Sequence, residues 1–149
     1  MSVKEWNEYF LDIAKCCASR SNCIRAHVGA VIVGPDRKIK ATGYNGTPSK
    51  VTSCMEYGKC YRIEHKIPSG TQYETCRSIH AEQNAIIQAG QDRCKDGTIY
   101  IYGHNMICIL CKRFIVQSGI KDCYLKKDDT SPIEHISVEQ IRKELTEAI

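Results

Sequence analysis

The chain has 149 residues, enough for one domain that buries roughly 68–70% of its unfolded surface around one core. Its formal charge of +4 comes from lysines and arginines scattered along the sequence, which does not form the basic stripe of a protein that binds nucleic-acid polymers. No segment resembles a signal peptide or a membrane span, so the ten cysteines are expected to be reduced thiols or metal ligands in the cytoplasm, with no membrane partner.

The N-terminal third is predicted to form a helix followed by a hairpin. Ser2 and Glu5 have the spacing of a capping box, and the apolar residues that follow recur at helical spacing. Residues 28–33 form a buried-strand run, and a Gly-Pro-Asp turn separates them from an alternating segment at 38–42.

The second half alternates helices and strands. Residues 79–89 have helical spacing that ends at Gly90, which puts His80 in the first turn of that helix. The later elements are a strand at 98–102, a helix at 108–118, a strand at 122–125 and a last helix after the capping box of Ser137 and Gln140. The order α-β-β-α-β-α-β plus a C-terminal helix predicts an α/β fold, with a mixed sheet sandwiched by helices.

The segment at about 43–77 has neither helical nor strand periodicity. Glycine, proline, cysteine and tyrosine accumulate there, and it is too long to be an idle connector in a domain of this size. We expect an insertion that is functional or held together by a metal.

His80-Ala81-Glu82 and the later Cys108-Ile109-Leu110-Cys111 together supply three zinc ligands and one further carboxylate. Zinc with three protein ligands keeps a fourth position for water and lowers the pKa of that water to about 7. Glu82 lies about 200° from His80 around a helix, so it is free to act as a general acid or base. A lone Cys-x-x-Cys could be a redox pair or two packing residues, but with His-Ala-Glu it indicates a zinc-dependent nucleobase deaminase.

Four segments resemble the deoxycytidylate (dCMP) deaminase family: residues 28–33, 43–48 (Gly-Tyr-Asn-Gly-Thr-Pro), 76–86 and 117–120, in a match from about 21 to 125. The resemblance implies a cytidine-deaminase-like fold, one deaminase domain over 1–149 and hydrolysis of dCMP to dUMP and ammonia, which supplies thymidylate synthesis. It also implies a homo-oligomer, often a hexamer, that dCTP and dTTP regulate, with Mg²⁺ accompanying the allosteric nucleotide.

The resemblance also implies roles for single residues. His80, Cys108 and Cys111 would hold the zinc, and Glu82 would move the proton as activated water attacks C4 of cytosine. Asn45 would hydrogen-bond the deoxyribose, although Asn-Gly is also a common turn.

The 5′-phosphate needs cationic donors, and Arg25, Lys50, Arg62 and Arg77 lie near the motifs. Each of them alone is more typical of solvated surface. Arg25, beside the first strand, is the preferred candidate.

Two departures from the family pattern affect the site. Ile107 stands where the family usually has proline. A proline would fix φ at the start of the helix, so its absence makes the backbone before Cys108 less preorganised but removes no metal ligand. Metal binding is therefore expected to survive. Lys126-Lys127-Asp128-Asp129 replaces a segment where relatives often have an aromatic residue near the base. Tyr124 or Tyr102 is therefore expected to stack on the base, unless the substrate differs from dCMP.

A second, structural zinc is expected from the cysteines that remain. Cys23 and Cys54 fall where some relatives have such ligands, and Cys60 and Cys76 would complete a closed tetrahedral site, with His65 as a substitute for either of the last two. The alternative is four buried free thiols. The other cysteines are predicted to be packing residues: Cys16, Cys17, Cys94 and Cys123.

Three other functions fit the same motifs. A deaminase of another cytosine nucleotide, such as dCTP, would use the same ligands. A tRNA adenosine deaminase would need a basic channel with stacking aromatics, for which the sequence has no cluster. A catalytically silent zinc or nucleotide-binding regulatory protein would fit the two departures, but it would not need Glu82.

Overall fold

A five-stranded sheet in the order β2-β1-β3-β4-β5 is the centre of the fold, in a computed structural model that describes residues 2–148. The strands are β1 (Gly29–Val33), β2 (Ile39–Tyr44), β3 (Thr98–Tyr102), β4 (Asp122–Lys126) and β5 (Glu134–Ser137). β3 and β4 are parallel, and the other neighbouring pairs are antiparallel. The predicted hairpin is present as β1 and β2.

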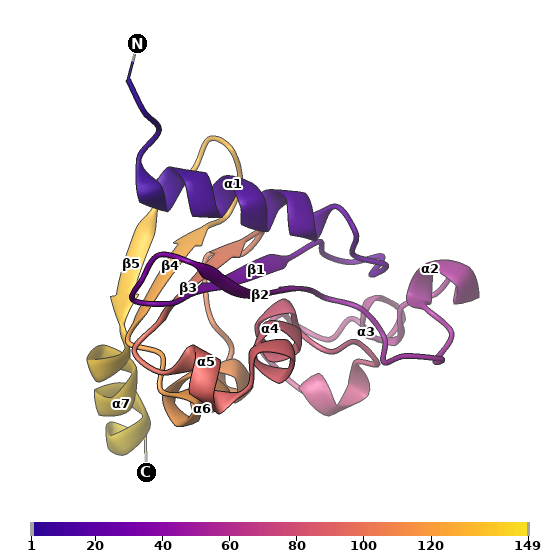
Figure 1. The fold of residues 1–149 in the computed structure, drawn as a ribbon. Coiled ribbons are helices and arrows are strands. Elements are labelled where there is room, and N and C mark those ends of the chain that lie inside the picture. Colours follow the sequence, from indigo (N-terminus) through magenta and orange to yellow (C-terminus); the bar gives the residue numbers. More distant parts are fainter. Residues whose placement is uncertain (1, 149) are drawn as a thin grey trace.

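Helices cover both faces of this sheet (Figure 1). α1 (Trp6–Ala18) packs on one face, and α4 (Ala81–Ala89), α5 (Gln91–Cys94) and α6 (Ile109–Ser118) lie on the other, with α7 (Val138–Glu147) beside α6. This arrangement confirms the predicted α/β fold. In the part of the chain that is described, no helix combines the length and the apolar character needed to cross a membrane.

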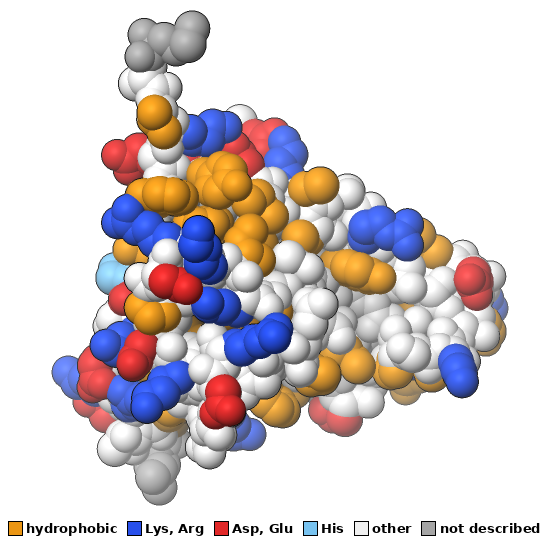
Figure 2. Space-filling view, in the orientation of Figure 1, with side chains coloured by type: hydrophobic (Ala, Val, Ile, Leu, Met, Phe, Trp, Pro, Cys, Tyr) orange, Lys and Arg blue, Asp and Glu red, His pale blue; other side chains and the backbone are white. Residues whose placement is uncertain are grey.

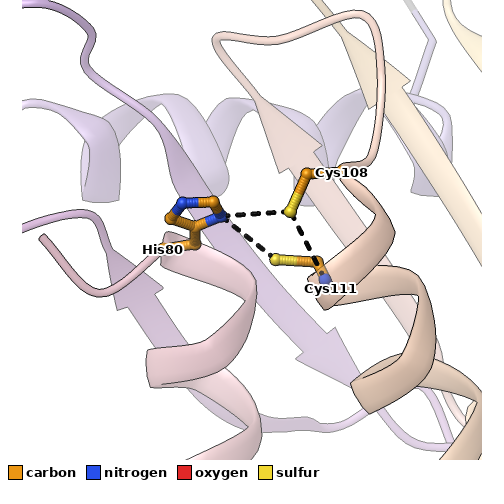
Figure 3. A group of neighbouring side chains, drawn as sticks. All are labelled: His80, Cys108 and Cys111. Carbon is orange, nitrogen blue, oxygen red and sulfur yellow. Dashed lines mark hydrogen bonds between the residues drawn. The ribbon is translucent and has the colours of Figure 1, made fainter. Parts of the chain in front are cut away.

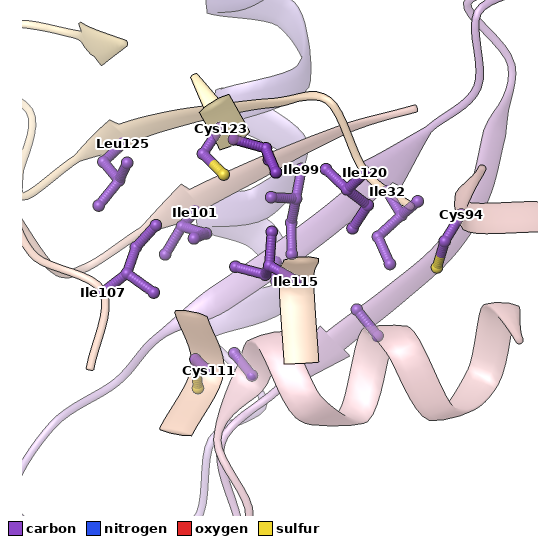
Figure 4. Packing of buried hydrophobic residues seen from close by; sticks show 14 of the residues in the cluster. Ile32, Cys94, Ile99, Ile101, Ile107, Cys111, Ile115, Ile120, Cys123 and Leu125 are labelled. Carbon is purple, nitrogen blue, oxygen red and sulfur yellow. The ribbon is translucent and has the colours of Figure 1, made fainter. Parts of the chain in front are cut away.

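β1 is buried along its whole length because strands flank it on both sides and helices cover both faces. Ala30 and Ile32 belong to the core cluster shared with α4 and α6, whereas Val31 and Val33 pack against α1. Figure 4 shows the larger cluster, in which Ile115 of α6 lies below the sheet. This core holds α4 and α6 in one layer, and their N-termini carry the metal-site motifs.

Two predicted helix starts were wrong by a few residues. The Ser2–Glu5 capping box does not form: α1 begins at Trp6, and Glu5 is the N-cap without a side-chain hydrogen bond. Aromatic packing stabilises the first turn of α1 instead, because the Trp6 and Phe10 rings stack with centroids 5.6 Å apart. His80 is the N-cap of α4 with extended backbone, so it precedes the first turn.

β5 was not predicted from the sequence. It has four residues, all exposed or half-buried, and pairs only with β4 at the edge of the sheet. So short and polar a segment has no clear period-two pattern, which is why sequence reasoning missed it.

The aperiodic segment contains three very short elements, α2 (Cys54–Tyr57), α3 (Tyr61–Glu64) and the 3₁₀ helix η1 (Tyr73–Thr75). It extends beyond α4 at one end of the molecule (Figure 1). Its two ends are joined by a bridge in which Gly46 and Ile79 exchange backbone hydrogen bonds of 3.1 and 2.7 Å. The segment therefore returns the chain to the start of α4.

Charged side chains of both signs lie on the surface. Figure 2 shows lysines and arginines intermixed with acidic side chains over the face that it presents.

Gly43 lets β2 lie directly against α4. A Cβ atom at this position would be 2.4 Å from the Ala81 carbonyl oxygen and 2.6 Å from the Ala85 nitrogen. We therefore expect Gly43→Ala to push α4 away and to lower the free energy of unfolding by about 1–3 kcal/mol. Urea unfolding would measure this loss.

Gly34→Ala is the matched control for that experiment. Its added Cβ would meet mainly the movable end of the Lys40 side chain, at 2.4 Å. A loss of stability at Gly34 as large as that at Gly43 would contradict the explanation from helix–strand contact.

Candidate active site

The structure brings His80, Cys108 and Cys111 together at the N-termini of α4 and α6 (Figure 3). His80 Nδ1 lies 3.3 Å from Cys111 Sγ and 3.4 Å from Cys108 Sγ, and all three ligand atoms are within 4.8 Å of one another. Tetrahedral zinc with ordinary bond lengths would place nitrogen and sulfur about 3.5 Å apart. The donor set and its spacing therefore fit zinc.

The helix start stabilises one of the two thiols as a thiolate. Cys108 is the N-cap of α6, where its sulfur accepts a hydrogen bond from the Cys111 backbone N–H at 3.4 Å. The hydrogen bond from the Cys111 thiol, helped by His80 and opposed by burial, lowers the pKa of Cys108 to about 4. The same hydrogen bond and burial raise the pKa of Cys111. A bound metal would have to displace the proton that Cys111 shares with Cys108 in this hydrogen bond.

The imidazole responds to the same thiolate. Burial alone would lower the pKa of His80, but its hydrogen bond and attraction to Cys108 outweigh burial and raise it. The charge of Arg62 opposes that rise. The charges of a thiolate and of a cation therefore act on His80 in opposite directions.

Glu82 is a buried carboxyl beside this ligand group. It is the second residue of α4 and is 6% exposed. Burial raises its pKa, against the attraction of His80. A carboxyl group with a raised pKa is suited to both accepting and donating a proton near neutral pH.

A cavity of about 320 Å³ opens next to His80 and Glu82. This volume falls at the lower end of the roughly 300–1,000 Å³ range of small-molecule sites. Most of the residues that sequence reasoning singled out line it: Cys23, Arg25, Asn45, Cys54, Cys60, Cys76, His80, Glu82 and Cys108. Cys111 lies behind them, fully buried.

Asn45 supports the wall of the cavity with its side chain. Its Oδ1 accepts a hydrogen bond from the Val28 N–H at 2.8 Å, and its Nδ2 donates to the Ala26 carbonyl at 2.9 Å. The residue is 7% exposed and still lines the cavity. One Nδ2 hydrogen therefore remains for a ligand.

The structure does not bring Tyr124 or Tyr102 to the cavity. Tyr124 stacks between Tyr100 and His135 at 5.4 and 4.6 Å, and the Tyr102 hydroxyl donates to Asp129 at 2.6 Å. Both tyrosines belong to the cluster on the α1 face of the sheet. The reason is the strand period of two, since their neighbours along each strand face α4 and α6.

The aromatic side chains that do line the cavity come from the aperiodic segment. Tyr73 packs edge-on against His80, with ring centroids 4.9 Å apart and planes at 75°, and Tyr61 lies further along the wall. Sequence reasoning missed both, because a three-residue 3₁₀ helix and a four-residue α-helix leave no periodic signal.

The four cysteines expected for a second zinc share the cavity wall but do not form a tight group. Among residues 2–148, only the His80 group has three ligand atoms within 4.8 Å of one another. Burial, followed by the neighbouring Cys23, raises the pKa of Cys54; the charge of Arg77 opposes this rise, and Cys60 and Cys76 add to it. His65 does not line the cavity and stacks on Tyr61 at 3.9 Å.

The remaining cysteines and Ile107 can also be compared with the sequence-based predictions. Cys94 and Cys123 are fully buried packing residues, as expected, and Cys17 is half-buried. The expectation was wrong for Cys16, which is exposed because it lies on the outer side of α1. Ile107 is 3% exposed within the main core, so burial holds the backbone before Cys108 in place of a proline ring.

A family model described as the cytidine and deoxycytidylate deaminase zinc-binding region matches residues 4–127. The chain belongs to this family. Within the family, it is 42% identical over 117 residues to the deoxycytidylate deaminase of Schizosaccharomyces pombe, across 78% of this chain and 35% of that protein. It is 35% identical over 132 residues to the deoxycytidylate deaminase of Mycobacterium phage D29, across 86% of this chain and 99% of that protein.

The chain thus spans about a third of the fungal relatives and nearly all of the phage relative. Solved structures of the family have the same fold. The dCMP deaminase of cyanophage S-TIM5 in complex with dCMP and dUMP is 25% identical, with a TM-score of 0.58 over 84% of this chain and 83% of that chain.

Proposed function

We propose that this chain catalyses the hydrolytic deamination of dCMP to dUMP and ammonia and so supplies dUMP for thymidylate synthesis. The observation that carries this proposal is the buried Glu82 carboxyl beside the His80–Cys108–Cys111 group, in a cavity of nucleotide-accommodating size. The phage D29 relative, which the chain spans almost completely, is a deoxycytidylate deaminase, and the similar cyanophage structure holds dCMP and dUMP. Both support dCMP as the substrate.

The chain's own residues would bind the base and move protons. Zinc held by His80, Cys108 and Cys111 would supply a water of lowered pKa. Glu82 would accept a proton from that water and donate it to N3 of cytosine as C4 is attacked. It would then take the proton of the new C4 hydroxyl group and pass it to the amino group, which leaves as ammonia. Burial raises the pKa of Glu82, which brings its carboxyl group closer to the pH at which it can both accept and donate a proton.

Asn45 is proposed to hydrogen-bond the deoxyribose through its remaining Nδ2 hydrogen. We expect Asn45→Asp, which keeps an acceptor for the Val28 N–H but loses the Nδ2 donor, to raise the KM for dCMP about ten-fold, consistent with roughly 1.5 kcal/mol for a hydrogen bond. Steady-state kinetics would measure it. A wild-type KM in a variant that folds normally would contradict the sugar contact.

Arg25 is proposed to bind the 5′-phosphate, because it is exposed at the rim of the cavity. Arg77 is a second exposed cation there, and its guanidinium lies 4.6 Å from the Tyr57 ring centroid. Lys50 does not line the cavity. Arg25→Ala should therefore weaken binding of dCMP more than that of deoxycytidine, which has no phosphate.

Steady-state deamination of five compounds tests the function itself: dCMP, CMP, dCTP, deoxycytidine and cytidine. Zinc-loaded protein would be assayed for ammonia release, with product chromatography. Preferential turnover of dCMP would support the proposal, and preferential turnover of dCTP would replace it with a triphosphate deaminase. Silence on all five compounds with zinc bound would favour a regulatory nucleotide-binding protein.

We also propose a structural zinc held by Cys23, Cys54, Cys60 and Cys76, which the shared position of the four thiols on the cavity wall supports. Two zinc ions per chain, reduced to one in Cys54→Ser, would agree with it, and one per chain in the wild type would contradict it.

We further propose a homohexamer regulated by dCTP and dTTP with Mg²⁺, which rests on the family resemblance, and a cytoplasmic location, which rests on the expected reduced cysteines. Sedimentation with and without each nucleotide would test the assembly.

A further inference from the structure

Arg62 is a buried cation without an acidic partner. It lies in α3 and is 2% exposed, and the ion pairs formed within residues 2–148 do not include it. A charge removed from water is costly unless hydrogen bonds satisfy it. The contacts of the guanidinium therefore indicate why it is buried here.

Those contacts all go to one turn segment. One terminal nitrogen donates to the Gln72 carbonyl at 2.7 Å and to Thr75 Oγ1 at 3.3 Å, and the other donates to the Pro68 carbonyl at 3.1 Å. Gln72 has a φ of 48°, a left-handed conformation that non-glycine residues seldom adopt. Such a conformation persists where surrounding contacts fix it, and Arg62 supplies them.

The same guanidinium reaches the metal site through an aromatic ring. Its Cζ lies 4.8 Å from the centroid of Tyr73, and Tyr73 packs edge-on against His80. The hydrogen bonds of the His80 ring within residues 2–148 run from Nδ1 to the two cysteine sulfurs. A metal-binding histidine usually has a further neighbour that fixes its ring orientation. Here Tyr73 is in the position to do so.

We propose that Arg62 is a positioning residue that holds Tyr73 against His80 and thereby fixes the orientation of a metal ligand. It does this by clamping residues 68–75 and by stacking on the Tyr73 face. The kinetic part of the test rests on the proposed deaminase function, whereas the ring orientation can be measured without substrate.

Cobalt(II) in place of zinc provides that measurement, because its visible absorption bands report the ligand geometry. Arg62→Lys keeps the positive charge but loses the planar fork. We expect it to shift the cobalt bands, to weaken metal binding about ten-fold in competition with a chelator, and to lower kcat with little change in KM. Arg93→Lys, the same exchange at an exposed site on α5, should change none of these.

Variants of Tyr73 keep the proposal testable if Arg62→Lys does not fold. Tyr73→Leu should reproduce the shift of the cobalt bands, and Tyr73→Phe, which keeps the ring, should retain the wild-type bands. The double variant Arg62→Lys/Tyr73→Leu should bind metal no more weakly than the worse single variant, because both act through one path.

Unchanged cobalt bands and metal affinity in Arg62→Lys and Tyr73→Leu would overturn the proposal, and so would additive losses in the double variant. A wild-type protein that binds cobalt but does not deaminate dCMP would count against the proposed function. In that case the spectra of the variants would still decide the role of Arg62.

Discussion

Glu82→Gln is expected to bind zinc like the wild type and to turn over dCMP about 10²–10⁴-fold more slowly. The amide has nearly the same shape as the carboxyl group but cannot exchange a proton between water and the base. Glu82 is not part of the His80–Cys108–Cys111 ligand group, so the metal should stay. Zinc analysis of the purified variant beside its kcat would measure both expectations.

Glu74→Gln is the matched control, since it makes the same change at an exposed residue of η1 that does not line the cavity. It should keep wild-type turnover. Near-wild-type turnover in Glu82→Gln would contradict the role of Glu82 as proton carrier, and loss of zinc from that variant would place Glu82 among the ligands.

The same substitution has a predictable effect on the stability of the metal-free protein. Burial raises the folded-state pKa of Glu82 above its ordinary value of 4.5. The folded state therefore holds this proton more tightly than the unfolded state, so wild-type stability falls as the pH rises from about 4.5 towards the folded-state pKa. Glu82→Gln should lack this loss and become the more stable protein at neutral pH.

The ligands and the carboxyl group could be predicted because their chemistry depends on local spacing. Cys108 and Cys111 are three residues apart at a helix start, and Glu82 follows His80 by two residues, so the motif spacing already distinguishes the ligands from the acid, although His80 itself lies just before the helix. The sheet could be predicted for a similar reason: β1 is an uninterrupted apolar run because both of its faces are buried.

The cavity wall could not be predicted because long-range contacts build it. Tyr73 meets His80, and Arg62 meets Tyr73, only after a segment without periodicity folds back. A buried arginine held by carbonyls looks the same in the sequence as a surface arginine. For Tyr124, in contrast, the sequence suggested a role in the site that the structure does not support. It was expected to stack on the base, but within β4 the alternation of side chains turns it to the α1 face of the sheet.

Cys111→Ser is expected to abolish tight zinc binding and with it the part of the stability that zinc provides. A serine hydroxyl does not ionise as a thiol does, so the site loses one of its two anionic ligands. At a metal concentration of about 1,000 times Kd, bound zinc adds about 4 kcal/mol to the free energy of unfolding. In a Cys54→Ser background, which lacks the proposed structural zinc, the Tm should therefore fall when a chelator is added, and with Cys111→Ser added the Tm should not change.

Cys123→Ser separates metal loss from the cost of a buried hydroxyl group. Cys123 of β4 is 0% exposed, as is Cys111, and it belongs to the same core cluster, but it is not in the ligand group. Both variants should lose some stability from burying the hydroxyl group, but only Cys123→Ser should keep the chelator-dependent fall in Tm. If Cys111→Ser also kept that fall in the Cys54→Ser background, the metal that stabilises this protein would bind outside the His80–Cys108–Cys111 group.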